Sequence, residues 1–190
     1  MRVVKHIDEI DVFSIEARFI EDRAHRLSLY IPFRIPQGKK VLCIVGQNPS
    51  EADETRADNT IRFLEKLVVS KKLPYRAIRM LNLFTRVDTR KEESRVDSRV
   101  ASWRDPILEA ARSNDDFLMV FGKLSRQGNY DFPARARELK ALLAQEGVTN
   151  IQKLGLHPPV AYAPHPRNRR IGYWNLEIAL ERYDFEDLDA

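Results

Sequence analysis

The pattern of apolar and polar residues predicts five strands. Three nearly continuous apolar runs, at residues 41–45, 77–84 and 117–121, are typical of strands that are buried on both faces of a parallel sheet. A shorter apolar run at residues 160–163 predicts a fourth strand. Residues 26–33 alternate between apolar and polar side chains and include a proline, which predicts an additional strand at the edge of the sheet.

Four helices are predicted between and after these runs. Residues 58–72 carry apolar side chains at helical spacing, and Asp58 is placed to cap the start of this helix because its carboxylate can accept backbone N–H groups. The other three helices are predicted at residues 97–112, 134–145 and 173–183.

Strand and helix therefore alternate four times after residue 40. This order predicts an α/β fold, in which residues 1–190 form a single three-layer α/β/α domain with a mostly parallel four-stranded sheet and an extra N-terminal edge strand. In open sheets of this kind, ligands bind beyond the carboxyl ends of the strands. We therefore expect a binding site where the predicted strands end.

Polar residues follow the predicted strands at those ends. Residues 46–50 read Gly-Gln-Asn-Pro-Ser, Asn82 interrupts the second apolar run, and His165 lies between two prolines after the last strand. A turn, a loop cap and a structural histidine are the ordinary roles of such residues. If these residues share one pocket, the Asn82 amide matches the donor–acceptor edge of a nucleobase. His165 would then donate to an atom that becomes negative during a reaction.

Aromatic and basic residues add to this candidate site. Phe84 is the last residue of the second predicted strand and offers a ring that can stack on a base, although core packing is the commoner role of an aromatic residue. Arg167, Arg169 and Arg170 come directly after the His-Pro pair, which makes them candidates for phosphate contacts at the edge of the pocket.

Composition narrows the functional classes. The single cysteine excludes a disulfide framework and a four-cysteine metal site, and neither a P-loop nor a serine-hydrolase motif is present. Acidic residues near the start of the helix at residues 58–72 usually interact with the helix dipole, so we expect no metal and no other cofactor. The net charge of +4 is too small to define a partner alone. Without a signal peptide or an apolar span, we expect a cytoplasmic monomer that contacts no membrane.

Three motifs in this order resemble the uracil-DNA glycosylase superfamily. Residues 46–50 are similar to its first motif, which reads Gly-Gln-Asp-Pro-Tyr in one branch and Gly-x-Asn-Pro-Gly in another. Residues 80–84 (Met-Leu-Asn-Leu-Phe) resemble its second strand motif, in which an asparagine reads the base. The His-Pro pair at residues 165–166 resembles the start of its last motif.

A narrower resemblance is to a bacterial and phage family of uncharacterised domains. It is carried by Asn-Pro-Ser-Glu-Ala-Asp at residues 48–53, by Asp58 and Thr60, and by Asn-Leu-Phe at residues 82–84. This resemblance covers roughly residues 26–167 and implies little about function.

The broader resemblance implies a metal-independent N-glycosylase, a hydrolase that cleaves the bond between the sugar and a damaged or modified base, with DNA rather than RNA as its partner. It implies that Asn48 positions the attacking water and that His165 stabilises negative charge on the departing base. It also implies base contacts by Gln47, Ser50, Asn82 and Phe84, and phosphate contacts by Arg167, Arg169 and Arg170.

Departures from the superfamily pattern keep alternatives open. Asn48 stands where the most active branch has an aspartate, so a carboxylate base is missing unless Asp53 or Asp58 reaches the pocket. Ser50 replaces a tyrosine that excludes 5-substituted pyrimidines, which leaves room for a larger base. No leucine wedge follows the last motif, apart from Ile171, and this favours single-stranded nucleic acid or a free nucleotide. A non-catalytic nucleotide- or nucleic-acid-binding module on the same fold is the alternative, followed by an enzyme of small nucleotides.

Overall fold

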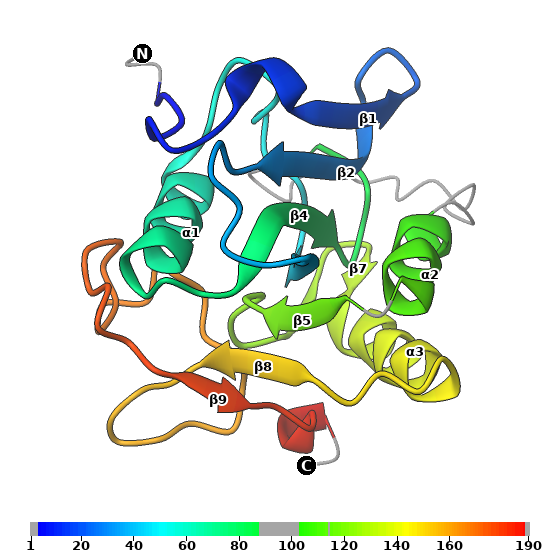
Figure 1. Cartoon of the computed structure of the whole chain (residues 1–190). Helices are drawn as coiled ribbons and strands as arrows, with labels where there is room; N and C mark the ends of the chain where they lie inside the picture. Colours follow the sequence, from blue (N-terminus) through cyan, green and yellow to red (C-terminus); the bar gives the residue numbers. More distant parts are fainter. Residues whose placement is uncertain (1–3, 88–102, 114, 189–190) are drawn as a thin grey trace.

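A mixed β-sheet forms the centre of the computed structural model, which describes residues 4–87, 103–113 and 115–188 (Figure 1). Within these residues the sheet has seven strands, β1 (Glu16–Ile20), β2 (His25–Pro32), β3 (Lys40–Gly46), β4 (Tyr75–Asn82), β5 (Asp116–Met119), β8 (Ile151–Leu154) and β9 (Leu180–Arg182). Their order across the sheet is β1-β2-β4-β3-β5-β8-β9. A separate two-stranded hairpin pairs β6 (Arg126–Gln127) with β7 (Tyr130–Asp131).

The α/β class is confirmed, but the expected mostly parallel four-stranded sheet with one edge strand is wrong. Parallel pairing joins β3 to β4 and β5, and β5 to β8, whereas β1, β2 and β9 pair antiparallel with their neighbours. The strand expected at residues 26–33 forms as β2, but it lies between β1 and β4. Its Pro32 is tolerated there because β1 pairs with β2 only as far as Tyr30, so the β1–β2 ladder does not need the N–H that proline lacks.

Two predictions for the C-terminal part of the chain are also wrong. Residues 160–163 form a loop, and the fourth parallel strand is β8, whose partly exposed side chains do not give a continuous apolar run. Residues 173–183 form turns followed by β9 instead of a helix. Gly172 and Tyr173 have φ angles of 63° and 64°, in the left-handed region, which a right-handed helix does not contain.

Helices cover both faces of the sheet. The predicted helices at residues 58–72 and 134–145 form as α1 (Asn59–Ser70) and α3 (Phe132–Gln145). The helix expected at residues 97–112 is present from its middle onward as α2 (Arg104–Arg112), and residues 97–102 lie outside the described residues. α1 covers one face, and α2 and α3 cover the other (Figure 1). Short 3-10 helices span Val12–Ser14 and Glu186–Leu188. The described helices include none that is both long and apolar enough to cross a membrane.

Alternating side chains of β3 join two hydrophobic cores. Leu42 and Ile44 belong to the core beneath α1, while Val41, Cys43 and Val45 belong to the core beneath α2 and α3. All five are at most 1% exposed, and full burial of one such aliphatic side chain stabilises the fold by about 1.5–3 kcal/mol. β3 is therefore held on both faces, and its carboxyl end is a fixed platform.

The strand order creates a crevice at the carboxyl ends of β3 and β5. The chain leaves β3 through α1 toward β4 on one side, whereas it leaves β5 through α3 toward β8 on the other side. Neighbouring parallel strands whose connections diverge in this way leave a gap between the following loops. The residues that follow β3 and β5 should therefore face a ligand.

A buried histidine–glutamate pair fastens the N-terminal segment to α1. The side chains of His6 and Glu65 form a hydrogen bond, Glu65 is 0% exposed, and the backbone N–H of Ile7 donates to the second carboxylate oxygen at 3.2 Å. Burial of the imidazole opposes its charge, but the hydrogen bond and the negative charge of Glu65 outweigh this effect and raise the pKa of His6 above its ordinary value of 6.5.

We expect the free energy of unfolding to fall as the pH rises through the pKa of His6. The raised pKa in the folded state means that this contribution is fully present below the unfolded value of 6.5 and is lost above the folded value. Urea unfolding between about pH 6 and pH 9 measures the decline. A His6→Gln variant should lose this part of the pH dependence, and parallel curves for the two proteins would rule out His6 as its cause.

Candidate functional site

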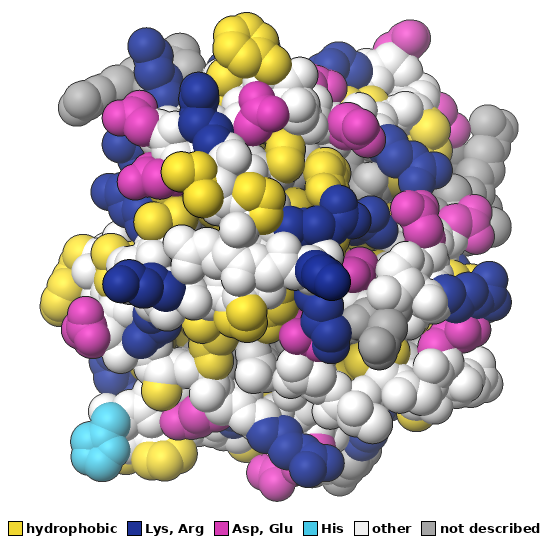
Figure 2. Space-filling model, in the orientation of Figure 1, with side chains coloured by type: hydrophobic (Ala, Val, Ile, Leu, Met, Phe, Trp, Pro, Cys, Tyr) yellow, Lys and Arg dark blue, Asp and Glu magenta, His cyan; other side chains and the backbone are white. Residues whose placement is uncertain are grey.

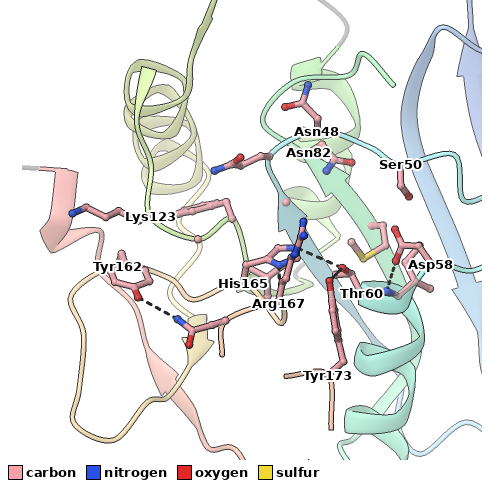
Figure 3. Close-up of a pocket in the computed structure, with 18 of the residues that line it drawn as sticks. Asn48, Ser50, Asp58, Thr60, Asn82, Lys123, Tyr162, His165, Arg167 and Tyr173 are labelled. Atoms are coloured by element: carbon pink, nitrogen blue, oxygen red, sulfur yellow. Dashed lines mark hydrogen bonds between the residues drawn. The ribbon is translucent and has the colours of Figure 1, made fainter. Parts of the chain in front are cut away.

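A cavity of about 620 Å³ opens at the carboxyl ends of β3, β4 and β5. The end of β3 supplies Gly46 and Gln47 to its wall, β4 supplies its last residue, Asn82, and the chain after β5 supplies Gly122. The first turn of α1 and the loop at residues 162–173 also contribute to the wall (Figure 3). Its volume suits a ligand of ordinary small-molecule size.

Backbone hydrogen bonds hold the ends of β3 and β4 together at this cavity. The N–H of Leu83 donates to the carbonyl of Gly46 at 2.9 Å, and the N–H of Phe84 donates to the carbonyl of Gln47 at 3.0 Å. A Cβ on Gly46 would come within 2.9 Å of the Asn82 Nδ2 atom. Glycine at this position therefore lets the Asn82 amide lie against the backbone of β3.

Two asparagines line the cavity, and each has side-chain polar atoms without a hydrogen-bond partner among the described residues. Asn82 is 7% exposed, and its amide has no hydrogen-bond partner among the described residues. The Asn48 Oδ1 atom is buried and also lacks a partner in the described part of the chain, while its Nδ2 donates to the Arg86 carbonyl at 3.5 Å. A buried polar group without a partner costs about 1–3 kcal/mol. That cost applies to the Asn48 Oδ1 atom, while the unpartnered Asn82 amide in the cavity wall is available to a polar ligand.

His165 presents a hydrogen-bond donor to the same cavity. The backbone N–H of Arg167 donates to His165 Nδ1 at 3.0 Å, so the neutral ring carries its proton on Nε2. Nε2 lies 3.5 Å from the Thr60 Oγ1 atom at the start of α1 (Figure 3). The N–H of Gly122 also donates to the Ala163 carbonyl at 2.8 Å, which ties the histidine loop to the end of β5.

Arg26 is a buried residue of the site that sequence reasoning missed. It lies on β2, is 2% exposed, lines the cavity, and donates to the Ala52 carbonyl at 2.7 Å and the Ser50 carbonyl at 3.5 Å. Burial lowers the pKa of Arg26 to about 10, and the nearby negative charges of Asp58 and Asp53 limit the fall. The guanidinium thus fastens the loop after β3 to β2.

The two acidic residues near α1 have different surroundings. Asp53 is not part of the cavity wall, and its carboxylate accepts from Thr55, Arg56 and Arg23. Burial alone would raise the pKa of Asp53, but the hydrogen bonds from Thr55 and Arg56 outweigh burial and lower it. Asp58 does line the cavity, and its Oδ1 accepts the Ile61 N–H at 2.7 Å, which confirms the predicted helix cap. No group of three or more His, Cys, Asp or Glu side chains in the described residues is placed to hold a metal ion.

Most, but not all, of the predicted site residues surround the cavity. Those in its wall are Gln47, Asn48, Ser50, Asn82, His165 and Arg167. Sequence reasoning did not assign site roles to Arg26, Thr60, Lys123, Tyr162, Asn168 and Tyr173, which also line it. Tyrosine in a loop is an ordinary residue, whereas Thr60 carried a signal through its place in the motif of the narrower resemblance, and Arg26 lies in the strand where that resemblance begins.

Three predicted contact residues lie elsewhere. Phe84 is buried in the core on the α3 side, where its ring lies 5.0 Å from the ring of Tyr130, because the chain turns away from the cavity after Asn82. Arg169 and Arg170 are exposed and outside the cavity wall, and Arg170 donates to the Pro158 carbonyl at 2.9 Å. The predicted base contact of Phe84 is therefore corrected, and the two arginines can act only outside the cavity.

The sequence of residues 33–163 matches a family described as "Protein of unknown function (DUF1643)". The chain belongs to the DUF1643 family. This confirms the expected membership of a family of uncharacterised domains. The DUF1643 match includes Asn48, Asp58 and Asn82 but ends before His165 and Arg167. No curated protein and no solved structure matched the chain.

Proposed function

We propose that the cavity binds a nucleobase and that the protein hydrolyses the N-glycosidic bond of a damaged or modified base in nucleic acid. The observation that carries this proposal is that Asn48, Asn82 and His165, which are far apart in the sequence, all line one cavity (Figure 3). Asn48 and Asn82 come from different strand ends, and both have polar atoms that lack partners among the described residues.

A base is a suitable ligand because it is flat, apolar on its faces and polar at its edge. The Asn82 amide offers a donor and an acceptor to that edge. Met80, Val120 and Phe121 contribute apolar atoms to the cavity wall, against which the faces of a base can pack. Gln47 and Ser50 lie in the same wall and are further candidates for edge contacts. The small Ser50 side chain leaves room for a substituent on the base.

The proposed chemistry assigns different tasks to the remaining polar groups. As the bond from the sugar to the base lengthens, negative charge develops on the base, and the Nε2–H of His165 donates to it. Asn48 holds the attacking water with its amide. The order of the three motifs along the chain, which resembles that of the uracil-DNA glycosylase superfamily, supports these roles.

Phosphate contacts are proposed close to the cavity mouth. Arg167 and Lys123 line the cavity and are exposed, and Arg169 and Arg170 follow in the same loop. On the face shown in Figure 2, described Lys and Arg side chains are interspersed with Asp and Glu, so that face does not offer a broad positive track. Ile171 is 0% exposed and cannot act as a wedge in a duplex. These features favour single-stranded nucleic acid as the substrate.

A non-catalytic binding module remains the second candidate, because position 48 holds an asparagine. Asn48 has no carboxylate to accept a proton from water, and its Nδ2 already donates to the Arg86 carbonyl. A protein that kept the pocket and lost the chemistry would bind the same ligands without releasing a base.

The test uses purified protein and oligonucleotides that each carry one uracil, 5-hydroxymethyluracil or hypoxanthine, in single-stranded and duplex form. We expect free base in the chromatogram and strand breaks after alkali, with single strands preferred. Salt-dependent binding without base release would identify a binding module instead. Neither binding nor release across the panel would reject both functions.

The substitution Gly46→Ala tests whether the Asn82 amide must keep its position. The new Cβ would lie 2.9 Å from Asn82 Nδ2 and push the amide by a few tenths of an ångström. We expect base release to slow by about tenfold, since small displacements of positioning groups have large effects, while the melting temperature changes little. An unchanged rate would show that the amide does not position the base.

A further inference from the structure

We propose that Asp58 is the group that accepts the proton of the attacking water. This inference rests on the proposed N-glycosidic hydrolysis. Among the described residues that line the cavity, Asp58 alone carries a carboxylate. Its side chain belongs to the start of α1. The proton acceptor would therefore come from a different element than Asn48, which lies in the loop after β3.

The other titratable groups of the cavity are poor proton acceptors. The Nδ1 atom of His165 is occupied by the N–H of Arg167, and the proton of the neutral ring is on Nε2. Arginine and lysine side chains in the wall are donors without a lone pair in their charged form, and the phenol oxygens of Tyr162 and Tyr173 are much weaker bases than a carboxylate. The geometry therefore leaves Asp58 as the base, and we assign the Nε2–H of His165 as the donor to the departing base.

The Asp58 carboxylate is held in place and faces positive charge. The N–H of Ile61 fixes Oδ1 at 2.7 Å, while Oδ2 has no hydrogen bond within the described part of the chain. The positive end of the α1 dipole and the buried guanidinium of Arg26 both interact favourably with a negative charge at this position. Figure 3 shows Asp58 on one side of Thr60 and His165 on the other.

The proposed step balances as a simple hydrolysis. The oxygen of water forms a bond to the anomeric carbon of the sugar, and the bond from that carbon to the base nitrogen breaks. The electron pair of the broken bond leaves with the base, where the Nε2–H of His165 stabilises it. One proton of the water passes to Asp58 and returns, through solvent, to the released base, so that the products are the free base and a sugar hydroxyl.

A purely structural role as a helix cap is the competing explanation, and a conservative substitution separates the two roles. Asparagine and serine cap helices about as well as aspartate. Asp58→Asn and Asp58→Ser should therefore keep the melting temperature of the parent protein, but neither has a carboxylate. Asp131, which caps α3 through the Ala134 N–H at 3.0 Å, supplies the matched control variant Asp131→Asn.

The experiment measures single-turnover base release and binding with the panel oligonucleotide that the parent protein cleaves fastest. We expect Asp58→Asn to bind it with unchanged affinity and to release the base at least about 100-fold more slowly. The Asp131→Asn control should release it at the parental rate. Added formate should restore part of the activity of Asp58→Ser, because a small carboxylate can occupy the vacated space.

The outcomes separate the role of Asp58 as a base from the glycosylase proposal itself. Release by Asp58→Asn within threefold of the parental rate, at about the same affinity, would overturn the role of Asp58 and leave the glycosylase proposal standing. Loss of binding together with activity would assign Asp58 to ligand binding and would also overturn its role as a base. Absence of base release by the parent protein across the whole panel would reject the glycosylase proposal and the role of Asp58 with it.

Discussion

Replacing His165 with alanine is expected to slow base release by about 100- to 1,000-fold, because a donor aimed at developing negative charge contributes most in the transition state. The affinity for intact substrate should change far less. Single-turnover release of free base, measured beside equilibrium binding, separates the two effects. The variant loses the hydrogen bond from the Arg167 N–H to the ring, but the Asn168 N–H still donates to the His165 carbonyl, so the fold should remain intact.

His157 supplies a matched control for this experiment. It is also followed by a proline, but it is exposed and lies outside the cavity wall. His157→Ala should release the base at the parental rate. If His165→Ala also kept a rate within about threefold of the parent, the imidazole would not stabilise the departing base.

Replacing Arg26 with methionine is expected to lower the free energy of unfolding by about 2–3 kcal/mol. The guanidinium donates to the Ala52 and Ser50 carbonyls, and its loss leaves these acceptors without a charged donor. The loop after β3 should loosen, so ligand affinity should fall as well. Urea unfolding and ligand titration measure the two effects.

Arg18→Met is the control for the loss of an arginine from a strand. Arg18 lies on β1 and forms an ion pair with Glu109 at 3.1 Å, but both side chains are 52% exposed. Exposed pairs of this kind contribute about 0–1 kcal/mol, so this variant should remain nearly as stable as the parent. Equal destabilisation by the two substitutions would show that the buried contacts of Arg26 have no special role.

The strands that could be predicted are those with a clear apolar pattern, which is alternating in β2 and continuous in the central parallel strands. β3, β4 and β5 have continuous apolar runs because helices cover both sides of them. β1 and β9 are short and partly exposed, so their sequences carry little apolar signal. The antiparallel edge strands could therefore not be predicted from the sequence, whereas the central parallel strands could.

The sequence could predict only those site residues whose positions are determined by the end of a strand. The rule that parallel strands end at one edge places Asn48 and Asn82 correctly around one cavity. His165 also lines this cavity, but it follows a loop and not the strand predicted at residues 160–163. The direction of a side chain after a strand depends on tertiary packing, which is why Phe84 points into the core. Arg26 reaches the cavity from an antiparallel strand, whose position next to β4 the sequence did not reveal.

The most direct test of the central claim, that the two asparagine amides meet one nucleobase, is an NMR titration of protein labelled with ¹⁵N in its asparagine side chains. Asn48→Ala and Asn82→Ala variants assign the two amide signals. Addition of the oligonucleotide that binds tightest should shift both signals together, with one dissociation constant, and leave the signal of the exposed Asn129 unchanged. Saturating oligonucleotide that shifts neither signal would contradict the account.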